Sequence, residues 1–513
     1  MKFLDCTLRD GGYYTQWDFN DDLVDEYLDT VNKLPIDCIE VGYRSIVKPE
    51  YLGQYYFLPD FTLNHIRSMV PNKKIAIMFN ESETTIDAAR ELLQEIDGLV
   101  DIVRLAVKPD RFDNAVRLSE FIRDKGFEVG FNLMYMSKVM KDNTVLDKLN
   151  TLNGVVTCFY LVDSYGGVYP SEVKSTVRKV KDILKMDIGF HGHNNLEMSL
   201  VNAITALQEG CTWVDGTITG MGRGAGNLKT ELFLVWLASQ KSITVDFNAL
   251  AYVVDKFERL REHHGWGASL PYMVSGANSL PQKDVMDWLT KRTYSMNSII
   301  HALQNKQDES CDLRLPELDT KKTYTNALLI AGGPNAVDHS KAVRQWVGKH
   351  KNDLVLVHVS SRNISYYEDL DVPQIYCLVG NEGVRLEKTF NDVSLKNAIA
   401  ILPPFPREMG TYIPEVLSDR SYELSKVEFT EKYHDSHTAV SLQTIIDLKA
   451  SNVYSVGFDG YGNSFIGQKE QDLLKENDYL FRQFVKAHSE IISFTPSQYS
   501  SLTVKSIYYL MSR

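Results

Sequence analysis

The sequence predicts an α/β protein: an N-terminal (β/α)₈ barrel, a helical extension, and a smaller C-terminal Rossmann-like three-layer α/β domain with a parallel sheet. Eight short apolar runs recur between residues 3 and 216, and segments with helical periodicity separate them. A strand, a crossover helix and two loops take about 30 residues, and this unit makes successive strands parallel. Polar residues follow most of the runs, as at the active rim of a barrel. An open doubly wound sheet is the alternative.

The composition is that of a soluble globular protein. The 513 residues are 44% hydrophobic and 24% charged, and 55 basic against 67 acidic side chains give a net charge of −12. This charge and the lack of a basic run argue against a nucleic-acid partner. No run approaches the ~18 apolar residues of a membrane helix, so we expect a cytoplasmic protein without a membrane partner. Six scattered cysteines, Cys311 among them, suggest neither disulfides nor a thiolate zinc site.

Each predicted barrel strand is a short run of mainly apolar residues. They are residues 3–6, 38–41, 75–78, 102–105, 129–132, 159–162, 188–191 and 213–216. The first intervening helix keeps apolar residues at a 3.6-residue spacing from Leu23 to Leu34, with Asn20 as its N-cap. The seventh does so from Leu196 to Leu207 and stops at Gly210.

Candidate functional residues lie on or just after these strands. Strand ends of a parallel barrel meet at one rim, so we expect these side chains to share a site. They are Arg9, Asp10, Glu40, Arg104, Asp163, His191, His193 and the glycine-rich segment 220–227.

Asp10, His191 and His193 form a candidate metal site. The two-residue period of a strand aims both imidazoles to one side, and barrel closure brings Asp10 near them. One carboxylate and two imidazoles make a facial set for Mn²⁺ or Mg²⁺, with Zn²⁺ and Fe²⁺ as alternatives, and Asn227 can add an amide oxygen. Alternatively the histidines cap a strand end and Asp10 forms a turn before Gly11.

The other candidates have two interpretations each. Arg9 can hold an oxyanion beside the metal or simply pair with a carboxylate. Segment 220–227 can cradle a phosphate or pack tightly at the rim. Glu40 and Asp163 can bind substrate or hold neighbouring arginines, and Arg104 can clamp a substrate carboxylate or belong to a buried ion pair.

Three motifs resemble a known superfamily. Thr7-Leu8-Arg9-Asp10-Gly11, His191-Gly192-His193 and the Gly-x-Gly…Ala-Gly-Asn segment 220–227 are similar to those of the metal-dependent lyases and synthases on this barrel, the HMG-CoA lyase-like DRE-TIM metallolyases. The resemblance covers residues 1 to about 235. It implies that Asp10, His191 and His193 are metal ligands, that Asn227 supports the site, and that Arg9 stabilises an enolate.

Within this superfamily, segments 163–167 and 257–272 most resemble 4-hydroxy-2-oxovalerate aldolases. The implied reaction is reversible cleavage of a 4-hydroxy-2-oxo acid to pyruvate and an aldehyde through a metal-bound enolate. The 3-hydroxy-3-methylglutaryl-CoA lyase branch is disfavoured because its loop cysteine is absent. Two alternatives remain: an acyl-CoA-dependent synthase acting on a 2-oxo acid, and a non-catalytic binding protein on a degenerate barrel.

The chain departs from the aldolases at one position. They carry an acid-base histidine soon after the Arg-Asp-Gly motif, whereas this chain has Gly12-Tyr13-Tyr14. The phenol of Tyr13 can replace that histidine or only shape the pocket.

The remainder of the chain predicts three parts. Residues 236–318 form a helical extension that in the aldolases mediates association, so we expect a homo-oligomer. The polar stretch 308–323 marks a boundary. Residues 323–490 carry five buried strands and intervening helices, which predict the Rossmann-like domain, and residues 491–513 form a tail.

The first strand of the C-terminal domain runs into Gly332-Gly333-Pro334-Asn335, where such sheets bind phosphates. This turn resembles one in nucleotide-sugar-binding transferases, and segment 459–462 can join the same crevice. A nucleotide or sugar ligand is one interpretation, and a plain tight turn is the other.

Overall fold

The computed structural model describes residues 1–139, 143–241, 243–291, 296–308, 314–380, 382–389, 398–407, 411–461 and 468–512. They form two compact units, Met1–Met286 and Asp287–Arg513. Cys311 lies outside the described residues, and the other five cysteines are buried and free of disulfides. Among the described residues, no helix has the length and apolar character to cross a membrane.

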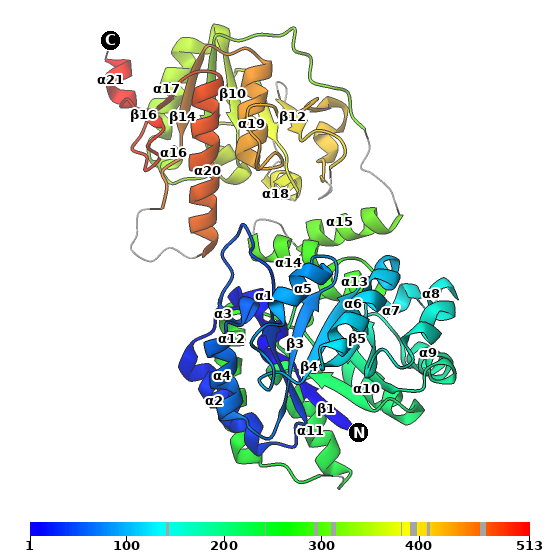
Figure 1. Ribbon diagram of the computed structural model, residues 1–513. Coiled ribbons are helices and arrows are strands. Elements are labelled where there is room, and N and C mark those ends of the chain that lie inside the picture. The colour runs from blue at the N-terminus through cyan, green and yellow to red at the C-terminus, as the bar shows by residue number, and fades with distance from the viewer. Residues whose placement is uncertain are drawn as a thin grey trace. The chain divides into compact units, whose positions relative to one another are not determined.

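Unit 1 contains a closed barrel of eight parallel strands, which confirms the predicted fold (Figure 1). Each strand pairs with the next along the chain, and Lys2 to Asp5 pair with Trp213 to Gly216 to close it. The strands are β1 (Lys2–Asp5), β2 (Cys38–Tyr43), β3 (Lys74–Asn80), β4 (Ile102–Val107), β5 (Glu128–Leu133), β6 (Cys158–Asp163), β7 (Asp187–Gly192) and β8 (Trp213–Gly216).

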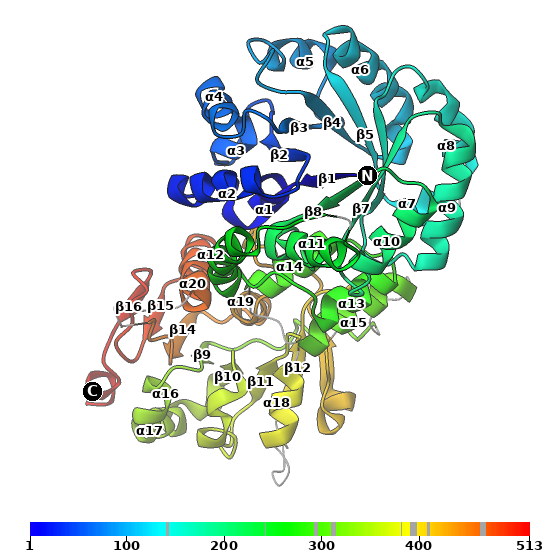
Figure 2. The same ribbon diagram turned by 90° about the horizontal axis from the view of Figure 1, so that it is seen from below.

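Helices surround these strands, as Figure 2 shows. The Asn20 side chain accepts a hydrogen bond from the Leu23 amide, and Gly210 ends the seventh helix with a φ of 113°, both as predicted. The surrounding elements are α2 (Asp21–Lys33), α3 (Gln54–Phe57), α4 (Asp60–Met69), α5 (Ile86–Leu92), η1 (Pro109–Arg111), α6 (Phe112–Asp124), α7 (Met136–Val139), α8 (Asn143–Lys148), η2 (Leu149–Leu152), α9 (Pro170–Ile183), α10 (Ser199–Glu209), η3 (Ile218–Gly220) and α11 (Thr230–Ser239).

A further helix, α1 (Thr7–Thr15), begins directly after β1. Asp10 therefore lies in the first turn of a helix, and the alternative that it forms a turn before Gly11 is wrong. Asp5 anchors the start of this helix, because its buried carboxylate accepts hydrogen bonds from the amide and hydroxyl of Thr7 and from the hydroxyl of Tyr27. Gly11 and Gly12 allow close packing, since a Cβ on either would lie 2.5 Å from Met221 or 2.1 Å from Trp17.

Helices follow the barrel, as the sequence predicts. They are α12 (Phe247–His264), α13 (Leu270–Ala277), α14 (Gln282–Lys291) and α15 (Met296–Asp308). The two units divide within α14, before the polar stretch 308–323 in which the sequence places the boundary. Gln282 ties the start of α14 to the barrel by donating to the Ser164 carbonyl and to the Asn195 side chain.

Unit 2 contains a second, fully parallel sheet in the order β13-β12-β11-β10-β9-β14-β15-β16. All five predicted strands are present, and three short strands were missed. Two of these, β15 and β16, lie within the predicted tail 491–513. This segment therefore contributes two strands to the sheet, and the prediction of a tail is wrong. The strands are β9 (Asn326–Ile330), β10 (Leu354–His358), β11 (Gln374–Cys377), β12 (Ala398–Leu402), β13 (Ser421–Glu423), β14 (Asn452–Val456), β15 (Ile491–Ser493) and β16 (Leu502–Val504).

Helices cover both faces of this sheet. The face of the sheet that contains the Leu329 side chain packs against α19 (His437–Asp447) and α20 (Gln468–Ala487). The opposite face, which contains Leu328, packs against α17 (Ser340–His350) and α21 (Ile507–Met511). Unit 2 thus has three layers. Its remaining elements are α16 (Asn335–Asp338), η4 (Lys351–Asp353), η5 (Ser361–Tyr366), α18 (Glu382–Thr389) and η6 (Glu415–Arg420).

Candidate active site

Asp10, His191 and His193 converge at the rim of the barrel. Asp10 comes from α1 and the two histidines from the end of β7, and all three are at least 93% buried. One potential ligand atom of each lies within 4.8 Å of those of the other two. Residues almost 200 positions apart in the sequence are therefore arranged so that they could hold one ion.

Hydrogen bonds orient both imidazoles. Nδ1 of His193 lies 2.8 Å from the backbone oxygen of Asp163, and Nδ1 of His191 lies 3.0 Å from Oδ2 of Asp215. Each Nδ1 faces an acceptor and therefore carries a proton, so that in the neutral ring Nε2 has the lone pair. This is the arrangement that metal-ligating histidines usually have.

Asn227 completes the donor set. Its Nδ2 donates to Oδ2 of Asp10 over 2.6 Å, while its Oδ1 is buried without a hydrogen-bond partner among the described residues. A buried amide oxygen without a partner is costly unless a ligand satisfies it. The residues present therefore fit a divalent cation.

Protonation states favour cation binding. Burial alone would raise the pKa of Asp10, but Arg9 and His191 hold it well below its usual range. Burial, assisted by His191, lowers the pKa of His193 to about 3, so this ring is neutral at physiological pH. Burial would also lower the pKa of His191, yet its contacts with Asp10 and Asp215 raise it. A carboxylate on each side of His191 thus makes the site attractive to positive charge.

Buried charges form a closed ring beneath the site. Arg9 bridges Asp10 and Glu40 with contacts of 2.6 Å each. Arg104 bridges Glu40 over 3.2 Å and Asp215 over 2.6 Å. His191 closes the ring, 3.0 Å from Asp215 and 3.5 Å from Asp10. We call this set the charge ring: Arg9, Asp10, Glu40, Arg104, Asp215 and His191.

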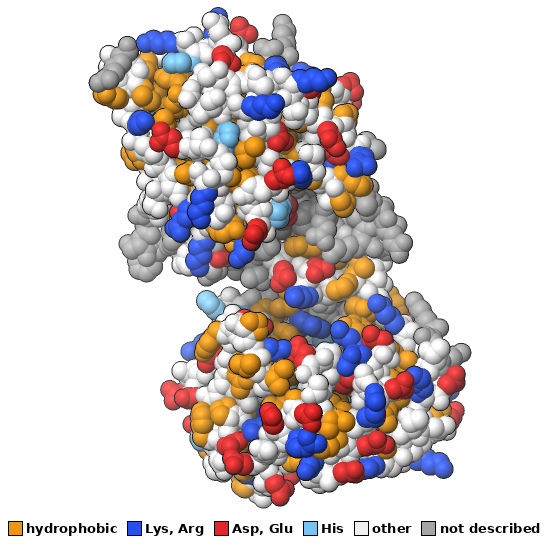
Figure 3. All heavy atoms as spheres, turned by 45° about the horizontal axis from the view of Figure 1, so that its top comes forward, with side chains coloured by type: hydrophobic (Ala, Val, Ile, Leu, Met, Phe, Trp, Pro, Cys, Tyr) orange, Lys and Arg blue, Asp and Glu red, His pale blue; other side chains and the backbone are white. Residues whose placement is uncertain are grey.

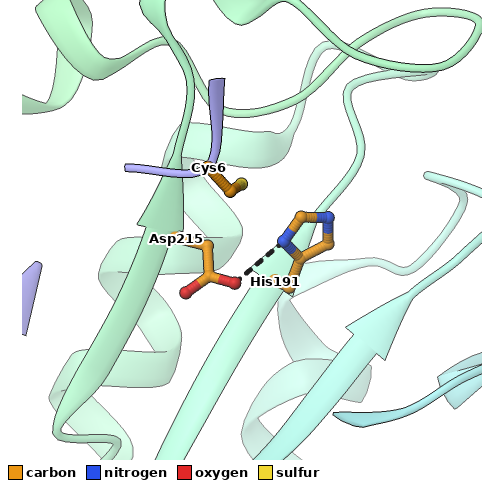
Figure 4. A group of neighbouring side chains, drawn as sticks. All are labelled: Cys6, His191 and Asp215. Carbon is orange, nitrogen blue, oxygen red and sulfur yellow. Dashed lines mark hydrogen bonds and ion pairs between the residues drawn. The ribbon is translucent and has the colours of Figure 1, made fainter. Parts of the chain in front are cut away.

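A second group that could hold a metal, Cys6 with His191 and Asp215, shares one histidine with the first (Figure 4). Burial raises the pKa of the Cys6 thiol well above its usual value, so the sulfur stays protonated. Oδ2 of Asp215 is occupied by Arg104 and His191. Asp215 therefore orients His191 from the side away from Asp10, and the Asp10 side of the ring is the better metal site.

The sequence predicts Glu40, Arg104 and Asp163 as substrate-binding residues. The structure places the first two in the charge ring, where Arg104 is 1% exposed and stacks 4.1 Å from the ring of Tyr160. The Asp163 carboxylate accepts from the amides of Gly167 and Val168, and burial raises its pKa to about 6. All three side chains thus have protein partners. Asp215, which completes the ring, was missed because an acidic residue inside a strand gives no sign of its partner.

Tyr13 lies one helical turn after Asp10. It is half-buried, its hydroxyl is 3.2 Å from that of Tyr43, and its ring packs edge-on against Trp17. Burial raises the pKa of Tyr43 well above its usual value. Tyr13 therefore stands beside the candidate metal ligands with its hydroxyl connected to a protonated phenol.

The glycine-rich segment after β8 folds on itself. The amides of Gly220, Met221, Gly226 and Asn227 donate to carbonyls within residues 217–223. Gly226 has a φ of 74°, and a Cβ there would lie 2.0 Å from the Gly220 oxygen. Tight packing, one of the two interpretations from the sequence, accounts for these amides, and the segment positions Asn227.

Known proteins share this barrel. The HMGL-like family model matches residues 1–256. A 4-hydroxy-2-oxovalerate aldolase from Bacillus cereus is 31% identical over 241 residues, which are 46% of this chain and 69% of that protein. The chain belongs to the HMGL-like family. A Pectobacterium atrosepticum protein with the same description is 29% identical over 235 residues, 45% of this chain and 67% of the relative.

A solved structure agrees with this membership. The N-terminal domain of a candidate aldolase from Bacteroides vulgatus is 50% identical, with a TM-score of 0.56. The match covers 59% of this chain and all of that domain. These matches confirm the predicted HMGL-like, 4-hydroxy-2-oxovalerate aldolase-like relationship, and with it an enzyme of the carbon-carbon lyase type.

Proposed function

We propose that this HMGL-like barrel is a divalent-metal aldolase that reversibly cleaves a 4-hydroxy-2-oxo acid to pyruvate and an aldehyde. The observation that carries the proposal is the convergence of Asp10, His191 and His193 within 4.8 Å, with Nε2 of both rings free to coordinate. Aldolases among the relatives match this part of the chain.

Asp10, His191 and His193 would hold the ion, with Oδ1 of Asn227 as a fourth ligand. An oxygen and nitrogen donor set without thiolate suits Mn²⁺ or Mg²⁺. When bound, such an ion supplies Lewis acidity toward a 2-oxo acid.

Arg9 is the proposed stabiliser of the enolate. Its Nε and Nη1 are fixed by Glu40 and Asp10, whereas its Nη2 has no hydrogen bond to any described residue. A guanidinium held rigidly by two carboxylates presents its free N–H groups in a fixed direction. It can therefore stabilise negative charge as it develops on a bound oxygen.

Tyr13 is the proposed acid and base at the 4-hydroxyl group. In cleavage the phenolate form of Tyr13 accepts the 4-hydroxyl proton as the C–C bond breaks and becomes the phenol, while the enolate takes up a proton from solvent to give pyruvate. In the reverse reaction the phenol gives its proton to the aldehyde oxygen. The Tyr43 hydroxyl, 3.2 Å away, can stabilise the phenolate by a hydrogen bond. Glu40, Arg104 and Asp163 act in this proposal as positioning residues, because their polar atoms bind protein groups.

The experiment combines metal analysis with proton exchange. Purified protein should bind Mn²⁺ stoichiometrically and exchange the methyl protons of pyruvate into D₂O, and both properties should be lost in Asp10→Asn and His191→Ala. His65→Ala, a partly exposed histidine on α4, is the matched control. Exchange of acetyl-CoA protons in place of pyruvate would favour the synthase alternative. Bound metal with no exchange of either would favour a non-catalytic binding protein.

We also propose that unit 2 is a Rossmann-like domain that binds a nucleotide or sugar-linked ligand. Consecutive strands run outward in opposite directions from the neighbours β9 and β14, and doubly wound sheets bind ligands at this switch point. The turn after β9 reaches it, because Gly333 donates to the Gly457 oxygen and Asn335 to Oδ2 of Asp459. Oδ1 of Asp459 is buried without a partner among the described residues, which exclude residue 462.

Arg362 could contact an anionic part of this ligand. It follows β10, is exposed, and its Cδ would lie 3.7 Å from a Cβ on Gly332. Calorimetric titration with UDP-glucose, CMP and glucose tests the proposal. Binding of either nucleotide should weaken in Arg362→Ala and in Asp459→Asn but not in Lys349→Ala, a surface control on α17. No heat of binding with any of the three probes would favour the plain tight turn.

A further inference from the structure

Arg223 is a cation at the candidate active site whose guanidinium forms no ion pair with a carboxylate of the described residues. It belongs to the glycine-rich segment that also carries Asn227, and its guanidinium carbon lies 5.2 Å from the ring centre of Tyr13. Its Nε is buried, and the side chain of Arg223 makes no hydrogen bond or ion pair with any residue the structure describes.

The other arginines of the barrel interior differ in this respect. Arg9 and Arg104 each contact two carboxylates, and the more peripheral Arg111 contacts Glu81. Arg223 is half-buried, and a guanidinium that loses part of its hydration without gaining an ion pair is destabilised. An anion that binds with the substrate would supply the missing ion pair, and the planar guanidinium suits a carboxylate or a phosphate.

The order of residues along α1 indicates which part of a substrate reaches Arg223. Asp10 and Tyr13 are three positions apart and therefore lie on the same side of the helix, about 4.5 Å apart along its axis. Asp10 marks the metal end, where the proposed function places the oxo acid group, and Tyr13 marks the 4-hydroxyl group. Arg223 lies over the ring of Tyr13, so the next part of the substrate, the aldehyde half, meets its guanidinium.

We propose that the aldehyde half of the substrate carries a carboxylate or a phosphate, which Arg223 binds. This inference rests on the proposed aldolase function and narrows its substrate class to 4-hydroxy-2-oxo acids with a second anionic group. The guanidinium contacts the ring of Tyr13, which packs against Trp17 and whose hydroxyl lies 3.2 Å from that of Tyr43.

Aldol addition of pyruvate to paired aldehydes tests the inference. Propanal is compared with succinic semialdehyde for the carboxylate, and glycolaldehyde with glycolaldehyde phosphate for the phosphate. In the Mn²⁺-loaded enzyme, kcat/KM should favour at least one anionic partner by about 10- to 100-fold, the range expected for hydrogen bonds to a charged group. The pair with the larger ratio identifies the anion.

Variants assign the preference to Arg223. In Arg223→Ala the ratio of anionic to neutral kcat/KM should fall close to one, mainly through KM, and Arg223→Lys should restore part of it. Arg259→Ala removes a guanidinium exposed on α12 and should leave the ratio unchanged. Calorimetric titration of the two Arg223 variants with the anionic aldehyde gives a readout that does not depend on turnover.

The possible outcomes distinguish a failure of the Arg223 proposal from a failure of the aldolase proposal. Exchange of pyruvate protons with equal or better use of the neutral aldehydes would overturn the role of Arg223 alone. A preference for anionic aldehydes that persists in Arg223→Ala would do the same. If the wild-type protein exchanges no pyruvate protons, the aldolase proposal fails, and the inference fails with it.

Discussion

Oδ2 of Asp215 lies 3.0 Å from Nδ1 of His191 and fixes the orientation of that ring. Burial alone would raise the pKa of Asp215, but the adjacent Arg104 guanidinium and His191 hold it below its usual value. Asp215 is therefore ionised and accepts a hydrogen bond from Nδ1–H, so that Nε2 faces Asp10 and His193. A residue that does not face the proposed ion thus determines how one of its ligands is presented.

Asp215→Asn should weaken Mn²⁺ binding by about 10- to 100-fold, as for other partners that orient a metal-ligating histidine. The amide oxygen can still accept a hydrogen bond from Nδ1–H, but the amide no longer neutralises Arg104. Calorimetric titration with Mn²⁺ measures the effect. Asp182→Asn, at an exposed position of α9, is the control, and equal affinities in both variants would refute the orienting role of Asp215.

Tyr13→Phe should lower kcat for cleavage of 4-hydroxy-2-oxopentanoate by about 10²- to 10⁴-fold, the usual contribution of a positioned acid and base. Pyruvate release, coupled to lactate dehydrogenase, measures it. Tyr51→Phe changes an exposed tyrosine and should have no effect. An unchanged kcat in Tyr13→Phe would show that the ring only shapes the pocket.

Gly12→Ala should destabilise unit 1 by about 1 to 3 kcal/mol, because the added methyl group would overlap the Trp17 ring and displace α1. Chemical denaturation followed by tryptophan fluorescence measures the change, and Mn²⁺ affinity should fall with it because Asp10 lies on the same helix. Gly348→Ala, in α17 with open space around the new Cβ, should instead stabilise unit 2 by roughly 0.4 to 1 kcal/mol.

Unit 2 should lose stability on acidification. Burial lowers the pKa of His358 to about 4, whereas an unfolded histidine titrates near 6.5. Between these values the unfolded chain binds more protons, so the free energy of unfolding decreases as the pH falls from 6.5 toward 4. The loss contributed by His358 is about 2 kcal/mol by pH 5.

Denaturation of wild type and His358→Phe at pH 7.5 and 5 measures that dependence. The phenyl ring can keep the stacking on Tyr376, and Oε1 of Gln374 keeps the Tyr376 hydroxyl as a donor. The variant should lose about 2 kcal/mol less than the wild type over this pH interval. An identical pH dependence in both proteins would show that His358 does not control it.

The sequence predicts the barrel well because its strands and helices repeat with local periodicities. Its eight strands, the Asn20 cap and the Gly210 stop all depend on neighbouring residues. The helix α1 was missed because Gly11 and Gly12 are poor helix formers, and the contacts with Met221 and Trp17 that require them come from distant segments. The strands β13, β15 and β16 have three residues each, too short for a periodic pattern.

The candidate site was predictable in its motifs but not in its pairings. The order of the strands and the closure of the barrel predict that Asp10, His191 and His193 come together. Whether Arg104 faces a substrate or a protein carboxylate depends on Asp215, 111 positions away, which no local pattern connects to it. For the same reason the sequence does not predict a role for Arg223, because the absence of an ion pair to its side chain is visible only in the folded chain.

The charge ring also constrains how this barrel can diverge. Each of its six members touches two others, so replacing any one removes one of the two ring partners of each of two neighbours inside the barrel. Mutational effects within it should be strongly epistatic, because a second substitution that removes a stranded neighbour can offset the first. In homologues that lack the charge ring, we therefore expect substitutions at several of its six positions together.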